Sequence, residues 1–232
     1  MKDLFGKAIL DFCQGHHTED LITSTSISDE ETLPLSYLFR NYSKMPELEQ
    51  KALDLSFGKI LDIGCGAGSH SLHLLQKEFD VKSIDISRNA IKACKLRGIK
   101  NAHVMDFIDE SETFDTILLL MNGSGVFRSL SQLPYFLNHL KNLLRKNGQL
   151  LMDSSDIKYM FEDDDGTYPH LPLDHYYGEL DYTITYRGAS ETFPWMYLDF
   201  DRLEQACAIL NLKCELIKEG EHYDYLARIT AK

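Results

Sequence analysis

The sequence predicts an α/β protein built on a doubly wound, mainly parallel sheet of seven strands. We expect an N-terminal helical cap before this sheet and a β-hairpin insertion after its fifth strand. The first observation is a short apolar strand at 59–63 that runs into Gly64, Gly66 and Gly68 and then into a helical pattern. The second is that apolar strands alternate with amphipathic helices as far as residue 153, which is typical of a buried parallel sheet. The third is a change to alternating, half-buried strands after residue 178.

The segment before the glycine turn predicts helices and no strand. Leu4, Ala8, Ile9 and Phe12 have helical spacing, and 45–55 predicts a second helix with Pro46 in its first turn. The polar, Ser- and Thr-rich stretch 20–34 predicts an exposed loop. Two interpretations of the aromatic stretch 37–42 stay open: a lid over a pocket, or a flap packed on the sheet edge.

The remaining elements follow from periodicity, and all of them fit one domain. We expect a helical cap (1–57), a core (58–153), an insertion (154–200) and a C-terminal helix with closing strands (201–232). The helix of the last part is expected to begin with a capping box at Asp201 and Glu204. The predicted core strands are 59–63, 81–86, 102–105, 114–121 and 149–153, and the closing strands lie near 213–217 and 223–230.

Composition narrows the class of protein. The 232 residues carry 24 Lys and Arg against 36 Asp and Glu, so the formal net charge is −12 and nucleic acid is a poor expected partner. The five cysteines are scattered without a C-x-x-C pair, as expected in a reducing compartment. Neither a signal peptide nor a membrane-spanning apolar run is visible, so a cytoplasmic, soluble protein is expected.

The glycine turn predicts which kind of nucleotide is bound. A P-loop is excluded because no Gly-Lys-Ser/Thr follows Gly68. The dinucleotide fingerprint G-x-G-x-x-G fails because Ser69 and Ser71 stand where its third glycine is needed. The turn is instead D-x-G-x-G-x-G, and a carboxylate at Asp62 repels a pyrophosphate but attracts an ammonium group. S-adenosylmethionine carries an ammonium and no phosphate.

Residues 59–153 resemble the Rossmann-like (class I) S-adenosylmethionine-dependent methyltransferases in the order and spacing of several motifs. LDIGCGAGSHSL is similar to the first motif of the family, and the resemblance implies that Asp85 holds the ribose hydroxyls. It also implies that Asp106 and Phe107 contact the adenine. Asp85 as a simple helix cap and Asp106 as a simple loop carboxylate remain the alternatives. The expected cofactor-binding residues are Asp62, Gly64, Cys65, Gly66, His70, Asp85, Ile86, Asp106, Phe107 and Met121.

No catalytic residue is assigned by the sequence. Methyl transfer from a sulfonium needs positioning, a dry site and, for some acceptors, a base. The candidates are Asn122 after the fourth strand, and His222 and Tyr223 before the last one. Further candidates are Asp153, Ser154, Tyr176, Tyr177 and Trp195, although sheet packing is the favoured explanation for each tyrosine.

The expected function is therefore S-adenosylmethionine-dependent methyl transfer to a small-molecule acceptor, with no metal. The acidic stretch 162–166 lacks the first ligand of an EF-hand loop, since position 161 is Phe. One alternative is a non-catalytic protein that binds S-adenosylmethionine as a sensor or partner subunit. An NAD-dependent oxidoreductase is a third interpretation, which the glycine spacing disfavours. The acceptor and the oligomeric state are not predicted.

Overall fold

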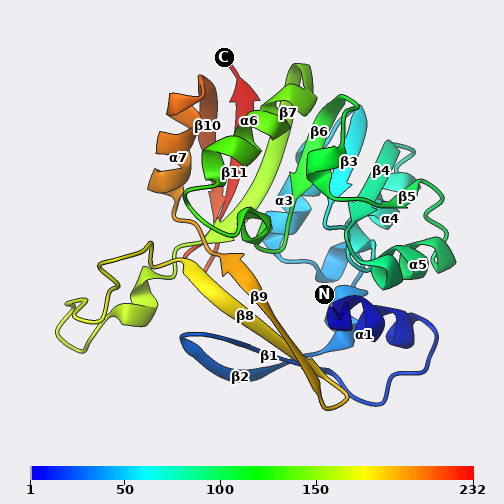
Figure 1. Ribbon diagram of the computed structural model, residues 1–232. Helices are drawn as coiled ribbons and strands as arrows, with labels where there is room; N and C mark the ends of the chain where they lie inside the picture. The colour runs from blue at the N-terminus through cyan, green and yellow to red at the C-terminus, as the bar shows by residue number, and fades with distance from the viewer. Residues whose placement is uncertain (1) are drawn as a thin grey trace.

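A seven-stranded mixed sheet forms the centre of the computed structural model, which describes residues 2–232 (Figure 1). Its strand order is β10-β11-β7-β6-β3-β4-β5. Five strands are parallel, namely β3 (Lys59–Ile63), β4 (Asp80–Asp85), β5 (Ala102–Val104), β6 (Phe114–Leu119) and β7 (Leu144–Ser155). The antiparallel closing strands are β10 (Leu212–Glu219) and β11 (Asp224–Ala231). The predicted fold class is confirmed.

Helices cover both faces of this sheet because its strands are apolar on both sides. In β3, Leu61 and Ile63 pack toward α6 (Leu133–Leu143) and α7 (Phe200–Ile209). Ile60 lies on the opposite face and packs with α3 (Glu47–Leu55) and α4 (Ser69–Gln76). Alternate residues of a strand point to opposite faces, so an unbroken apolar run serves two cores at once.

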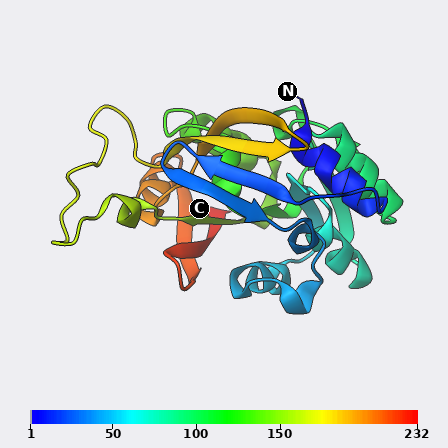
Figure 2. The ribbon, with the colours of Figure 1, turned by 90° about the horizontal axis from the view of Figure 1, so that it is seen from below.

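A second sheet lies beneath the carboxyl ends of the parallel strands (Figures 1 and 2). It consists of β1 (Leu21–Thr25), β2 (Ser28–Leu33), β8 (Glu179–Tyr186) and β9 (Ala189–Met196), in the order β2-β1-β8-β9. The hairpin β8–β9 is the predicted insertion. The prediction of a loop at 20–34, in a cap without strands, is wrong. These polar residues form β1 and β2 because β1 pairs with the distant β8, and no local pattern announces such a partner.

Shorter elements join the two sheets. The helix α1 (Leu4–Cys13) packs on α5 (Arg88–Leu96) and β8, and α2 (Leu35–Leu38) follows the first hairpin. The 3₁₀ turn η3 (Gly123–Phe127) after β6 meets β9 so closely that a Cβ on Gly125 would lie 2.1 Å from the Trp195 ring. The other 3₁₀ turns are Tyr42–Lys44, Phe107–Asp109 and Lys158–Phe161.

Two local predictions near the C-terminal half need correction. The helix α7 is capped by Asp199, whose carboxylate accepts a hydrogen bond from the Arg202 amide at 2.9 Å, and not by Asp201. Strand β7 begins at Leu144 and not at Gln149. Asn147, which has a φ of 66°, forms a local irregularity within that strand.

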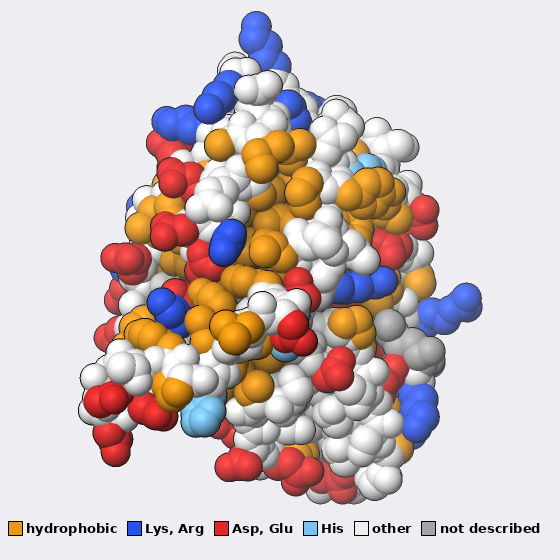
Figure 3. Space-filling view, turned by 60° about the vertical axis from the view of Figure 1, so that its left-hand side comes forward, with side chains coloured by type: hydrophobic (Ala, Val, Ile, Leu, Met, Phe, Trp, Pro, Cys, Tyr) orange, Lys and Arg blue, Asp and Glu red, His pale blue; other side chains and the backbone are white. Residues whose placement is uncertain are grey.

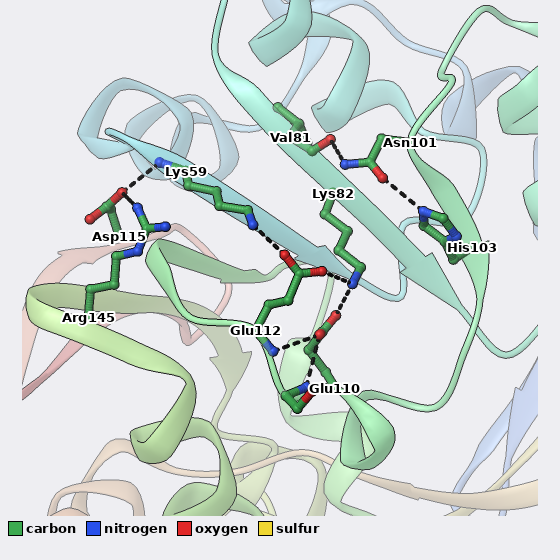
Figure 4. A network of polar contacts seen from close by, with 10 residues as sticks. Lys59, Val81, Lys82, Asn101, His103, Glu110, Glu112, Asp115 and Arg145 are labelled. Atoms are coloured by element: carbon green, nitrogen blue, oxygen red, sulfur yellow. Dashed lines mark hydrogen bonds and ion pairs between the residues drawn. The ribbon is translucent and has the colours of Figure 1, made fainter.

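A network of lysine and glutamate side chains ties the start of β6 to β3 and β4 (Figure 4). The Lys82 ammonium lies 2.8 Å from Glu110 and 2.6 Å from Glu112, which also pairs with Lys59 at 2.5 Å. Hydrogen bonds from Lys59 and then Lys82 lower the pKa of Glu112 to about 2. The network sits at the opposite end of β3 from the glycine turn and keeps these strands aligned there.

The segment between β7 and β8 projects from the body and carries acidic side chains near its tip (Figure 3). Leu173 in this segment is fully exposed. Within residues 2–232, no helix is both long and apolar enough to cross a membrane.

Candidate functional site

The glycine turn after β3 has a backbone that only glycine adopts without strain. Gly64, Gly66 and Gly68 have φ values of 68°, 52° and 80°. The amides of Gly64 and Cys65 donate to the Ile84 carbonyl at 2.9 and 3.1 Å, which anchors the turn to the end of β4. A Cβ at Gly64 would meet no atom within 4 Å, so this part of the turn borders open space. Backbone groups here are free to approach a ligand.

Asp85 closes β4 directly beside the turn. One of its oxygens accepts the Gly66 amide at 3.0 Å and the other accepts the Ser87 amide at 2.8 Å. Burial raises the pKa of Asp85 to about 6, although these two hydrogen bonds lower it. The cap of α5 is Ser87, whose hydroxyl accepts the Ala90 amide, so Asp85 is not needed for that task. Each carboxylate oxygen keeps a lone pair for a further donor.

The next predicted residues follow β4 and β5 along the same edge. Ile86 is about half exposed, and Asp106 accepts the Ile108 amide at 3.2 Å, as a loop carboxylate would. The Phe107 ring is buried and lies 5.3 Å from the Phe136 ring. The contacts expected of Asp106 and Phe107 with an adenine stay predictions.

Two predicted residues lie beneath the turn. Asp62 is buried and accepts a hydrogen bond from the Ser71 hydroxyl of α4 at 2.5 Å, and burial raises the pKa of its carboxyl. The Cys65 thiol lies 3.8 Å from the Cys94 thiol, and this contact together with burial raises the pKa of Cys65 well above its ordinary value. Asp62 thus fixes the start of α4, and its predicted attraction for a ligand ammonium stays a prediction.

His70 belongs to a buried chain of charged groups that the sequence reasoning missed. Its Nε2 lies 2.6 Å from the Glu49 carboxylate, whose other oxygen pairs with the Arg40 guanidinium. Burial lowers the pKa of His70, but the hydrogen bond to Glu49 and the charge of Asp62 outweigh it and raise the pKa overall. The one signal in the sequence was that Glu49 precedes Ala52 by three residues and so shares the buried face of its helix.

A pocket of about 260 Å³ opens beside Glu49, the central member of this group of buried charges. Four of the predicted residues contribute to it: Met121 and Asn122 after β6, and Asp153 and Ser154 near the end of β7. The Asp153 carboxylate accepts the amides of Met121 and Gly123, each at 3.0 Å. Burial raises the pKa of Asp153 to about 7. The complete lining is Tyr37, Pro46, Leu48, Glu49, Met121, Asn122, Asp153, Ser154, Ser155 and Asp224.

The Asn122 side chain is held by partners on three elements. Its amide nitrogen donates to the Met196 carbonyl at 3.2 Å, and its oxygen accepts the hydroxyls of Ser124 at 3.1 Å and Ser154 at 2.9 Å. Asn122 itself has a φ of 57°. These bonds join the ends of β6, β7 and β9, so Asn122 shapes the pocket wall.

His222 and Tyr223 lie outside this pocket. His222 is an exposed turn residue whose amide donates to Asp224, and Tyr223 stacks on Tyr159 with ring centroids 4.7 Å apart. Tyr223 lines a different cavity of about 450 Å³ near the start of α7. The structure brings neither residue to the glycine turn, because the turn between β10 and β11 lies beyond β7 at the far side of the sheet.

No group of three or more His, Cys, Asp or Glu side chains among residues 2–232 has the arrangement of a metal site. The residues around the glycine turn and Asp85 favour an organic ligand. A nucleoside with a charged substituent fits this site. The site offers exposed backbone at the glycine turn, a carboxylate one strand further on and an adjoining pocket.

These features and the sequence comparisons define the class. Residues 56–188 match a methyltransferase domain family, and the chain belongs to the S-adenosylmethionine-dependent methyltransferases. The chain is similar to a SAM-dependent methyltransferase of Bacteroides fragilis, solved in complex with S-adenosyl-L-homocysteine. The two are 44% identical with a TM-score of 0.91, and the match covers 99% of this chain and 95% of the other.

Curated relatives are more distant. The ubiquinone biosynthesis O-methyltransferase of Pelagibacter ubique is 26% identical over 49% of this chain and 49% of its own length. A putative methyltransferase of Geobacillus is 24% identical over 41% of each chain. The matched part of this chain thus spans less than half the length of these relatives. The cofactor of the protein is S-adenosylmethionine.

Proposed function

We propose that the protein transfers a methyl group from S-adenosylmethionine to a small-molecule acceptor that enters the pocket between α3 and the ends of β6 and β7. The observation that carries the proposal is the position of this pocket next to the predicted cofactor residues. Met121 lines it directly, and His70 reaches it through Glu49. At about 260 Å³ it suits a small molecule rather than a folded protein or a nucleic acid.

The cofactor would be held by residues of the glycine turn and by Asp85. Backbone amides of the turn and the spare lone pairs of the Asp85 carboxylate are the groups that recognise a nucleoside and its ribose hydroxyls. The bound sulfonium supplies an activated methyl group. The protein supplies orientation of the two reactants at the carboxyl ends of the parallel strands, beneath which the second sheet lies.

The experiment is an acceptor screen with methyl-labelled S-adenosylmethionine, in which release of S-adenosylhomocysteine and label transfer are both followed. We expect transfer to one chemical class of small acceptor. Calorimetry in parallel compares S-adenosylmethionine, S-adenosylhomocysteine and NAD. Tight NAD binding without binding of either sulfur compound would refute the proposal, and tight sulfur-compound binding with no transfer to any acceptor would favour a sensor instead.

A further inference from the structure

The pocket is lined by carboxylates and by no cationic side chain. Glu49, Asp153 and Asp224 contribute to its wall, and none of its lining residues is a lysine, arginine or histidine. The charge of Glu49 is balanced from behind by Arg40 and His70. The pocket therefore favours a positively charged occupant.

Asp153 differs from Glu49 because it lacks a counter-ion. Only 9% of its surface is exposed, yet among residues 2–232 no lysine, arginine or histidine forms an ion pair with it. Two backbone amides, those of Met121 and Gly123, hold the carboxylate in place at the pocket wall. A buried carboxylate is costly unless it is paired, so such a group in a cavity is kept for a partner that the chain itself does not provide.

We propose that the acceptor is a small primary or secondary amine, which enters as an ammonium ion, and that Asp153 both binds this ion and accepts its proton. The inference rests on the proposed methyl transfer and names the acceptor class for that site. Met121 lines the pocket and donates its amide to Asp153. Asp153 thus lies beside a residue of the predicted cofactor site. An acceptor nitrogen must also lie next to the cofactor, so Asp153 is within its reach.

The reaction balances with these groups alone. A proton passes from the ammonium nitrogen to an Asp153 oxygen and leaves a lone pair on nitrogen. As the new N–C bond forms, the bond between methyl carbon and sulfur breaks and its electron pair stays on sulfur. The amine leaves as a methylated ammonium ion, and Asp153 returns its proton to water. A pKa near 7 suits a carboxylate that must take up and release a proton at neutral pH.

The surroundings of Asp153 set the sign of the pH dependence. Besides burial, the charge of Glu49 of α3 raises its pKa and that of His70 of α4 lowers it, while Tyr37 and Tyr225 lie close enough for the charge of Asp153 to raise their own pKa values. As the pH rises through about 7, Asp153 gains its negative charge. His70, whose pKa is raised, loses its positive charge in the direction of higher pH. Both changes strengthen the binding of a cation.

The first test uses the full chain saturated with S-adenosylhomocysteine and three probes that share one ring: cyclohexylamine, cyclohexanol and cyclohexanecarboxylate. We expect the amine to bind at least about tenfold more tightly than the alcohol, and the carboxylate to bind more weakly than both. Amine affinity should rise about tenfold between pH 6 and pH 8, because the ionised fraction of a carboxyl with a pKa near 7 rises by that factor. An alcohol that binds as tightly as the amine, or an amine affinity independent of pH, would overturn the inference.

The second test uses variants and label transfer. Asp153→Asn should lose at least about tenfold in cyclohexylamine affinity and keep the wild-type affinity for S-adenosylhomocysteine. Asp156→Asn, which lies three residues further on and lines the other cavity, is the matched control and should keep both. If Asp153→Asn does not fold, the comparison of the three probes on the wild-type protein still tests whether the acceptor is an amine. Labelled methyl transfer to alcohols but not to amines overturns the inference and leaves the proposed function standing, whereas failure to bind S-adenosylhomocysteine refutes the proposed function itself.

Discussion

Replacing Glu49 by glutamine should destabilise the protein strongly, because it leaves the Arg40 guanidinium buried without its counter-ion. Both side chains are only 4% exposed, and the Nε of Arg40 already lacks a hydrogen-bond partner. Removing one partner of a buried ion pair costs about 3–5 kcal/mol. For a chain of this length each kcal/mol lowers Tm by about 2–4 °C, so a fall of roughly 6–20 °C is expected.

The assay is thermal and urea unfolding of Glu49→Gln beside a control on the same helix. Glu47→Gln removes an ion pair with Lys218 that is largely exposed to water, and its Tm should not change measurably. The double variant Arg40→Met/Glu49→Leu removes both charges and should recover most of the loss. Equal Tm values for Glu49→Gln and Glu47→Gln would refute the reasoning, and so would a double variant no more stable than the single one.

The pH dependence of this loss has a definite sign. Burial raises the pKa of Glu49, but the bonds to His70 and Arg40 lower it overall, so its stabilisation is present above the ordinary glutamate pKa and fades as the pH falls through the lowered value. The pKa of His70 is raised, so its stabilisation is present below the ordinary histidine pKa and is lost as the pH rises through the raised value. The stability difference between wild type and Glu49→Gln should therefore peak at about pH 5–6.

Three further variants test the candidate site. Asp85→Ala should weaken binding of S-adenosylhomocysteine about tenfold or more, since a hydrogen bond to a charged group contributes roughly 1.5–3 kcal/mol. Calorimetry at pH 8 measures this affinity, and an unchanged value would remove Asp85 from the site. Gly68→Ala should lower Tm by more than Gly98→Ala, because both positions have positive φ but only at Gly68 would a Cβ collide, 2.3 Å from the Ile99 side chain. His222→Ala should keep the wild-type rate of methyl transfer in the labelled assay, and a large loss would return this exposed residue to the candidates.

Much of the cofactor half of the protein was determined by its sequence alone. The residues of this half lie within a few positions of the strand end that places them. This holds for the glycines after strand 59–63 and for the carboxylates at 62, 85 and 106. Local periodicity therefore suffices to predict the five parallel strands and to place these carboxylates at their ends. The glycine spacing also separated the ligand class from dinucleotides.

The hairpin β1–β2, its place in the second sheet and the pocket proposed for the acceptor were decided only by the tertiary structure. Strand β1 is polar and pairs with β8 about 160 residues away in the chain, so its strand character comes from a partner that no local pattern shows. Glu49 becomes a wall of the pocket because α3 packs at the ends of β6 and β7, and Asp153 becomes an unpaired buried carboxylate for the same reason. Burial and pairing depend on what lies across the fold, and they turn two ordinary acidic residues into the candidate acceptor site.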